Sequence, residues 1–146
     1  MSLFDLLKKD HREAVALLKK IENSPLADER RDLFTQLKPA LTAHSRAEEE
    51  AVYEVVKNRD KTHTRILENY EEHHLIDDLL EKLSSSSPAD ETWVARLTVM
   101  RELLEHHIVN EEEVLFFRIR ALCNREQMNE MAENFQFAKD ERRKAS

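Results

Sequence analysis

The chain has 146 residues, a net charge of −7 at pH 7, no glycine and three prolines. This length suits a single domain spanning residues 1–146 with one core. The lack of glycine argues against tight β-hairpins and glycine-rich phosphate loops, and the negative charge argues against nucleic acid as a partner. Hydrophobic residues make up 40% and charged residues 36% of the chain, which is typical of a soluble protein rich in amphipathic helices.

Nothing in the sequence predicts a membrane or secretory segment. No run of about 18 apolar residues occurs, so we expect no membrane span. The first eleven residues are amphipathic and lack a signal-peptide core, which makes the cytoplasm the expected location. The single cysteine, Cys123, cannot form an internal disulfide or a cysteine-only metal site, and we expect it to fill the core near a helix end.

Four long helices are predicted from apolar residues that recur every three or four positions. They cover residues 2–22, 28–58, 61–83 and about 88–122. Ser2 and Asp5 form a capping box for the first helix, and Pro39 is expected to kink or divide the second. Ser87 and Pro88 predict the cap and first turn of the fourth.

A shorter fifth helix is predicted after a cap at residues 124–127, and we expect Met128, Met131 and Phe135 to cover one end of the bundle. Helices of roughly 20–30 residues with short links favour an all-α fold. The predicted architecture is an up-down-up-down four-helix bundle with a short C-terminal fifth helix.

Two stretches of the sequence resemble each other closely. His44 and Glu48 begin one His-x-x-x-Glu-Glu-Glu stretch, and His107 and Glu111 begin another. A His and a Glu four residues apart lie one turn apart on the same helix face. Two such pairs that face each other would supply imidazoles and carboxylates to one point, a combination that suits iron, manganese or zinc.

The first and third helices each add a single histidine to this pattern. His11 follows Asp10, and His73 follows Glu72, with apolar residues at matching distances after each histidine. The chain is therefore a repeated helix pair, a lone His followed by His-x-x-x-Glu, which predicts a site with approximate two-fold symmetry.

We therefore predict one metal centre from six residues that lie on the apolar stripes of four helices. Burying two carboxylates and four imidazoles without a cation would be very costly, and a metal ion removes that cost. The predicted ligands are His11, His44, Glu48, His73, His107 and Glu111.

Other polar residues near the motifs fit the stripes less well. His74 and His106 adjoin predicted ligands but are the weaker candidates, and His63 is expected at the surface. We expect Glu49, Glu50, Glu112 and Glu113 to form solvated faces. Tyr70 is expected to be a core residue, with a hydrogen bond to a ligand as the alternative.

With ordinary α-helical spacing, the apolar stripes continue through both motifs. On this spacing the second helix continues from Glu48 to Val52 and Val55. The fourth helix continues from Glu111 to Val114. These valines are therefore predicted to face the core.

With these motifs in place, the chain resembles the hemerythrin-like family, also called the HHE cation-binding domain. The resemblance runs from Asp10-His11 through both His-x-x-x-Glu motifs. It implies a four-helix bundle with two non-haem iron ions. Glu48 and Glu111 would bridge the irons together with an oxide or hydroxide, and two histidines would bind each iron.

One feature departs from the oxygen-carrying branch of that family, which has a fifth histidine four residues after the one on the third helix. Here that position is Asp77. Four histidines leave each iron about one ligand short, unless Asp77, His74 or water completes one of them, and an open position favours chemistry. The expected function is thus binding of, or reaction with, O₂, peroxide or nitric oxide in stress handling. The alternative is an O₂ or iron sensor or carrier without turnover.

Overall fold

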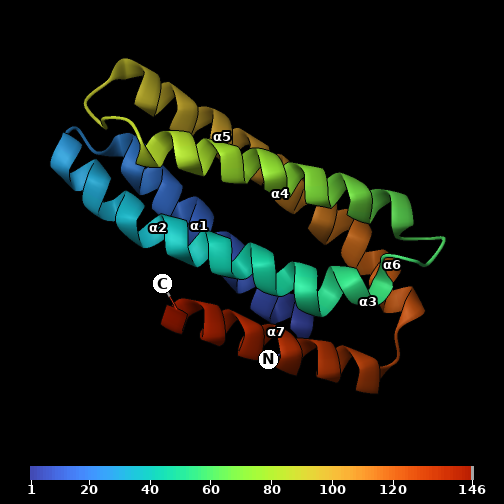
Figure 1. The fold of residues 1–146 in the computed structure, drawn as a ribbon. Helices are drawn as coiled ribbons and strands as arrows, with labels where there is room; N and C mark the ends of the chain where they lie inside the picture. The colour runs from blue at the N-terminus through green and yellow to red at the C-terminus, as the bar shows by residue number, and fades with distance from the viewer. Residues whose placement is uncertain (146) are drawn as a thin grey trace.

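The computed structural model describes residues 1–145, and this part of the chain is helical with no strand. In chain order the elements are α1 (Leu3–Asn23), α2 (Ala27–Glu48), the π-helix η1 (Glu49–Tyr53), α3 (Glu54–Val56), α4 (His63–Ser84), α5 (Glu91–Asn110), the π-helix η2 (Glu111–Leu115), α6 (Phe116–Leu122) and α7 (Arg125–Ala145). The segments η1 and α3 continue α2, and η2 and α6 continue α5. The chain therefore forms four long helical rods and α7, which confirms the all-α prediction (Figure 1).

The four rods form an up-down-up-down bundle. Helix α1 packs on α2 and α5, and α4 packs on α5 and α2. The loop between α1 and α2 and the loop between α4 and α5 lie at the same end of the molecule (Figure 1). This is the topology predicted for long helices with short links.

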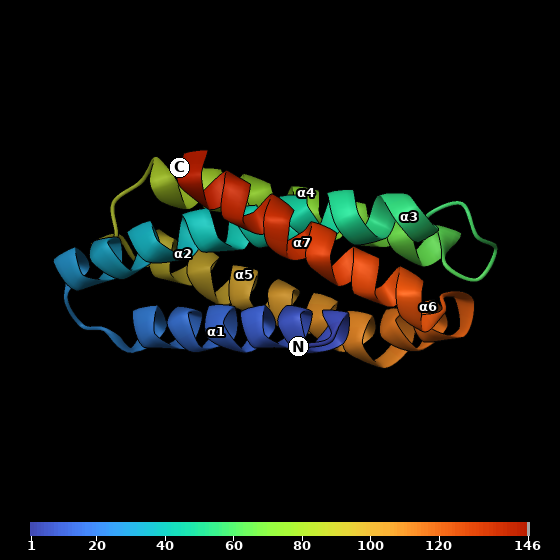
Figure 2. The same ribbon diagram turned by 90° about the horizontal axis from the view of Figure 1, so that it is seen from below.

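Helix α7 is longer than predicted and lies in a different place. It has 21 residues, as many as α1, and it packs along α2, η1 and α1 instead of over one end (Figure 2). Its buried residues, Met131, Ala132, Phe135 and Ala138, recur at helical spacing. This apolar seam is long enough to cover one side of the bundle.

The predicted helix boundaries were only partly correct. The capping box of Ser2 and Asp5 is present. Pro39 lies inside α2, which is not divided there. The predicted cap at Ser87 is wrong because residues 87–90 form a turn, in which the Asp90 N–H donates to the Ser87 carbonyl at 3.0 Å. Helix α5 therefore begins only after Asp90.

The apolar core has two parts, one on each side of the predicted ligands along the bundle. The part on the side of η1 and η2 contains Phe4, Tyr53, Phe116 and Phe135 together with residues of α7. The other part is mainly aliphatic and includes Trp93 near the loop between α4 and α5. The polar ligand layer thus lies inside the bundle, away from both ends.

The π-helical segments change which residues face this core. Val55 is 55% exposed, whereas Val56 is 1% exposed. Likewise, Val114 is only half-buried and Leu115 is fully buried. A π-helix places about one more residue in a turn than an α-helix. The apolar stripes predicted through both motifs are therefore wrong by one residue after η1 and η2.

None of the helices in residues 1–145 is both long and apolar enough to cross a membrane.

Candidate metal centre

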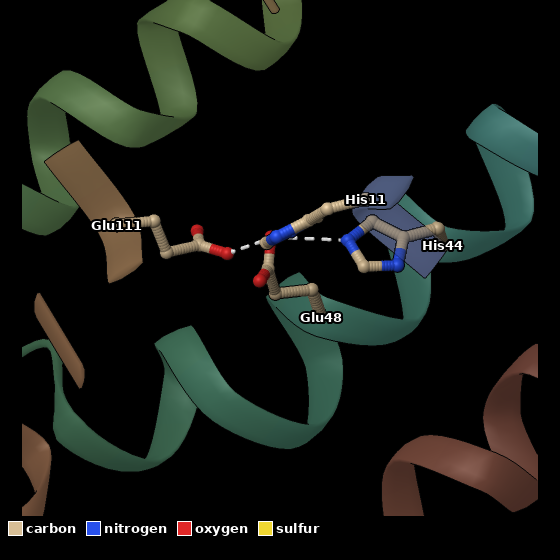
Figure 3. Close-up of side chains that lie close together, drawn as sticks. All are labelled: His11, His44, Glu48 and Glu111. Atoms are coloured by element: carbon tan, nitrogen blue, oxygen red, sulfur yellow. Dashed lines mark ion pairs between the residues drawn. The ribbon is translucent and has the colours of Figure 1, made fainter. Parts of the chain in front are cut away.

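The six predicted ligands lie together in the buried layer between the two parts of the core. The side chains come from α1, α2, α4 and α5 and from the start of η2. All six are buried, and Glu48 and Glu111 have no exposed surface. Their ligand atoms form two overlapping clusters in which all atoms lie within 4.8 Å of one another: His11, His44, Glu48 and Glu111 in the first, and Glu48, His73 and His107 in the second. Figure 3 shows the first of these clusters.

The neighbouring histidines lie elsewhere. His73 and His107 are each 2% exposed. In contrast, the side chain of His74 is 60% exposed, and His106 is exposed and contacts Asn110. His63 is also exposed. Burial therefore favours His73 and His107 over their neighbours as ligands, while metal ligation by these residues remains a prediction.

Each of the four buried histidines has its Nδ1 atom against a carboxylate. The partner of His44 is Asp10 at 2.8 Å, and the partner of His107 is Glu72 at 2.7 Å. The partners of His11 and His73 are Glu112 and Glu49, both at 2.7 Å. A carboxylate that accepts from Nδ1 fixes the ring and leaves Nε2 as the free ligand atom. All four Nε2 atoms are thus available to the centre.

The expectation that Glu49 and Glu112 are solvated was therefore wrong, because both are half-buried partners of histidines. Glu50 and Glu113 are exposed, as predicted. Position in the sequence distinguishes the two kinds of glutamate. Glu49 and Glu112 directly follow a predicted ligand, just as Asp10 and Glu72 directly precede one.

Three of the four partner carboxylates are in turn held by cations. Lys139 of α7 donates to Asp10 at 3.0 and 3.2 Å. Arg46 donates to Glu49 at 3.1 Å, and Arg65 donates to Glu72 at 3.2 Å. These cations fix the carboxylates, and hence the imidazole rings, from outside the layer.

The sequence reasoning missed two further residues at the centre. The Tyr53 hydroxyl, which is fully buried, lies 2.9 Å from Glu48 Oε1 and 2.6 Å from Glu111 Oε2. Asn69 Nδ2 donates to the Tyr53 oxygen at 3.1 Å. Tyr53 follows Glu48 by five residues, and η1 turns it inward. Only the recognition of a π-helix could have placed it there.

Two residues that the sequence left open lie outside the centre. The Tyr70 hydroxyl donates to Glu54 at 2.6 Å, at an exposed position. Asp77 pairs with Arg46 at 2.9 Å and is half-buried. Neither residue contacts a predicted ligand through these groups.

The histidines differ strongly in proton affinity. Burial favours the neutral imidazole of His11, but Glu111 and Glu112 outweigh it and raise the pKa of His11 to about 9. In the same way, Glu111 and Glu72 overcome burial and raise the pKa of His107 to about 9. Burial dominates at His44 and lowers its pKa to about 4. Without metal, protons on His11 and His107 therefore balance part of the buried negative charge.

The two buried carboxylates and the phenol also differ in proton affinity. Burial and the nearby Glu111 carboxylate raise the pKa of Glu48 well above its usual value. At Glu111, contacts with Glu48, His107 and His11 overcome burial and lower the pKa. Burial and both carboxylates raise the pKa of Tyr53. The centre therefore has a strong demand for positive charge.

Unpaired polar atoms at the centre support a metal ion as the source of that charge. His11 Nε2, Glu48 Oε2 and Glu111 Oε1 are buried and have no hydrogen-bond partner. His11 Nε2 lies 3.2 Å from Glu111 Oε1 (Figure 3), in a geometry that makes no hydrogen bond. Buried polar atoms are normally paired, and nitrogen and oxygen ligands at this spacing suit iron, manganese or zinc.

Comparisons with known proteins find a curated relative, a similar solved structure and a matching family. A curated relative, a DNA nickase from Nostoc sp., is 29% identical over 140 residues. That match covers 95% of this chain and 39% of the relative, so the chain spans about two-fifths of the relative's length. A crystal structure of a hemerythrin HHE cation-binding domain-containing protein from Mycobacterium kansasii superposes with a TM-score of 0.85 at 22% identity, covering 99% of this chain and 89% of that one.

The structural match includes α7, because it covers nearly the whole chain. The family model named hemerythrin HHE cation-binding domain matches residues 2–119, which contain all six predicted ligands. Domains of this family bind metal ions, and a buried His/Glu cluster is present in this chain. The chain belongs to the hemerythrin HHE cation-binding domain family.

Proposed function

We propose that this chain is a non-haem di-iron protein that binds or reacts with O₂, peroxide or nitric oxide in oxidative or nitrosative stress. The observation that supports this most directly is the pair of overlapping buried clusters, which share Glu48. Two clusters with a common carboxylate suit two ions better than one. We further propose that residues 1–146 act as one domain, and a cytoplasmic location remains a prediction.

In this proposal His11 and His44 hold one ion, and His73 and His107 hold the other. Glu48 and Glu111 would be shared between the two ions, together with an oxide or hydroxide. When bound, the iron pair supplies a Lewis-acidic, redox-active site for diatomic gases and peroxides. The protein contributes fixed imidazoles, shared carboxylates and a buried layer that excludes bulk water.

Tyr53 has a positioning role in this proposal, whereas the contacts of Asp77 and His74 do not support them as further ligands. Its hydroxyl is hydrogen-bonded to both bridging carboxylates, whereas Asp77 is paired with Arg46 and His74 is exposed. We therefore assign to Tyr53 the role of orienting the two carboxylates.

The name of the Nostoc relative suggests a different activity, cleavage of one DNA strand. We propose that the present chain does not act on DNA, because its net charge of −7 would repel the phosphate backbone. Incubation with supercoiled plasmid should produce no more nicks than an equal concentration of free iron. Nicking that exceeds this control would contradict the proposal.

The test of the proposed function is the metal content of the purified protein together with its absorption spectrum. We expect two irons per chain and an oxo-bridge charge-transfer band that changes on addition of peroxide or nitric oxide. Consumption of peroxide would indicate a catalyst, and a reversible change with O₂ alone would indicate the sensor or carrier. Zinc alone, or no metal, would overturn the di-iron proposal.

A further inference from the structure

A cavity of about 280 Å³ adjoins the centre on the side of the histidines. Its lining includes all four buried histidines. Glu48, Glu111 and Tyr53 do not line it. The carboxylates and the phenol thus close one side of the centre, and a molecule that approaches it meets the imidazoles first.

The cavity is larger than a diatomic gas or hydrogen peroxide requires. A water molecule occupies roughly 30 Å³ in the liquid, and a cavity of about 150 Å³ in another protein binds benzene. By this scale the present cavity holds an organic molecule of roughly ten non-hydrogen atoms. Its volume is close to the lower limit of ordinary small-molecule sites, about 300 Å³.

Much of the inner wall of the cavity is apolar. Its apolar residues include Leu37, Leu41, Ile76 and Leu104, which all belong to the aliphatic part of the core. A ligand with an apolar body would therefore gain from leaving water. The buried polar groups of the lining are the four imidazoles and the hydroxyl of Ser45, and a polar end of the ligand that points towards the centre would meet the imidazoles.

The outer rim of the cavity carries no net charge. Asp10 and Glu13 contribute two negative charges there, and Lys139 and Arg143 contribute two positive charges. Lys139 is also paired with Asp10. Such a rim gives no electrostatic preference for anions or cations, which favours a neutral ligand.

We propose that this cavity binds a small neutral organic molecule with a branched alkyl or aryl body and a hydroperoxide end that faces the histidines. The hydroperoxide end rests on the proposed function, because it assumes a metal centre that accepts peroxides. Binding of the body depends only on the shape and lining of the cavity. The two parts can be tested separately.

The binding test uses 2-phenyl-2-propanol, an unreactive alcohol of the expected size, titrated calorimetrically into the purified protein. Ala14 and Ala40 line the cavity from α1 and α2 and are half-buried. Ala14→Phe and Ala40→Phe fill the space from two sides, so each should weaken binding at least tenfold. Ala121→Phe, at an exposed position outside the lining, is the matched control and should change the affinity less than twofold. Circular dichroism confirms folding of all three variants.

Failure of saturable binding in the unmodified protein, or equal affinity in folded filled variants and control, would overturn the cavity proposal. The second test compares cumene hydroperoxide with hydrogen peroxide. Filling the cavity should lower the rate with cumene hydroperoxide, relative to the rate with hydrogen peroxide, at least tenfold. An unchanged ratio of the two rates would contradict the proposal. If the alcohol binds as expected but neither peroxide reacts, the organic site stands and the proposed peroxide chemistry fails.

Discussion

The two halves of the centre have the same predicted ligands but different surroundings. We call His11 and His44 the first half, and His73 and His107 the second half. Phe116 stacks near His11, with ring centres 6.4 Å apart, and Tyr53 occupies the equivalent place beside His73 at 5.4 Å. The repeat thus preserves an aromatic ring in both halves, but only the second half has a hydroxyl group.

Helix α7 adds a second difference. Phe135 of α7 contacts the ring of His44, with centres 5.5 Å apart, and Lys139 holds Asp10. The corresponding cations of the second half, Arg46 and Arg65, come from α2 and α4. The second half is therefore completed within the bundle, whereas the first half depends on a helix beyond the family match at residues 2–119. A repeated motif can fix the ligands without fixing their environment.

The largest expected effect is the loss of metal from both halves of the centre at once. Glu48→Ala combined with Glu111→Ala deletes the carboxylates that the halves share, so metal content should fall from two ions per chain to none. Elemental analysis measures this loss. His63→Ala, at an exposed position, should keep the full content. Retention of one ion in the double variant would mean that one half binds metal without a bridge.

Phe135→Ala should affect the first half and the packing of α7. Phe135 is fully buried, and loss of such a side chain typically costs about 3–5 kcal/mol. Urea unfolding of the metal-free protein measures this change in the free energy of unfolding. Phe137→Ala is the control in the same helix because Phe137 is 68% exposed, and it should cost less than about 0.5 kcal/mol. Equal effects of the two variants would show that α7 does not stabilise the site.

Tyr53→Phe would make the aromatic rings of the two halves alike. It removes the hydroxyl that contacts Glu48 and Glu111 and leaves both buried groups without that partner. The free energy of unfolding should therefore fall by about 1–3 kcal/mol. The same unfolding measurement on metal-free protein tests this value. Tyr70→Phe is the control, since its hydroxyl bonds an exposed carboxylate. Equal free energies of unfolding for the two variants would contradict the proposed asymmetry between the halves.

The halves should also respond differently to acid. The pKa of His44 in the folded metal-free protein is about 4, below its usual 6.5. As the pH falls from 6.5 towards 4, the unfolded chain takes up this proton and the folded chain does not, so stability falls. His44→Gln should flatten this acid limb in urea unfolding at pH 7 and pH 5. An unchanged slope would show that His44 is not the responsible group.

At high pH the two halves should behave alike. His11 and His107, one in each half, have pKa values raised to about 9. Their stabilisation of the metal-free protein is fully present below pH 6.5 and is lost as the pH rises through 9. Metal binding has the opposite dependence, because it must displace these protons. Apparent metal affinity should therefore increase between pH 7 and 9.

The fold was largely predictable because the helices are long and their apolar residues recur regularly. The same periodicity placed all six predicted ligands on buried faces, since each lies on a stripe with leucine or isoleucine neighbours. The prediction failed where the spacing itself changes. The π-helices η1 and η2 bury Val56 and Leu115 in place of Val55 and Val114, and a rule based on α-helical spacing cannot detect this shift.

The environment of the centre was less predictable than its ligands. Glu49 and Glu112 stand in runs of three glutamates, and composition alone does not tell which glutamate turns inward. Tyr53 and Asn69 come from different repeats and meet only after the bundle has formed. Such contacts depend on the approach of distant helices, for which a single sequence contains no periodic signal.

The carboxylate partners of the histidines connect the four rods in a closed ring. The bond from His44 to Asp10 lies within the first helix pair, and the bond from His107 to Glu72 lies within the second. The bonds from His11 to Glu112 and from His73 to Glu49 join the two pairs. Each pair therefore presents to the other the donor and the acceptor that the other requires. A protein of half this length could close the same ring by associating with a second copy of itself, and the present chain has the organisation of such a dimer with its subunits fused.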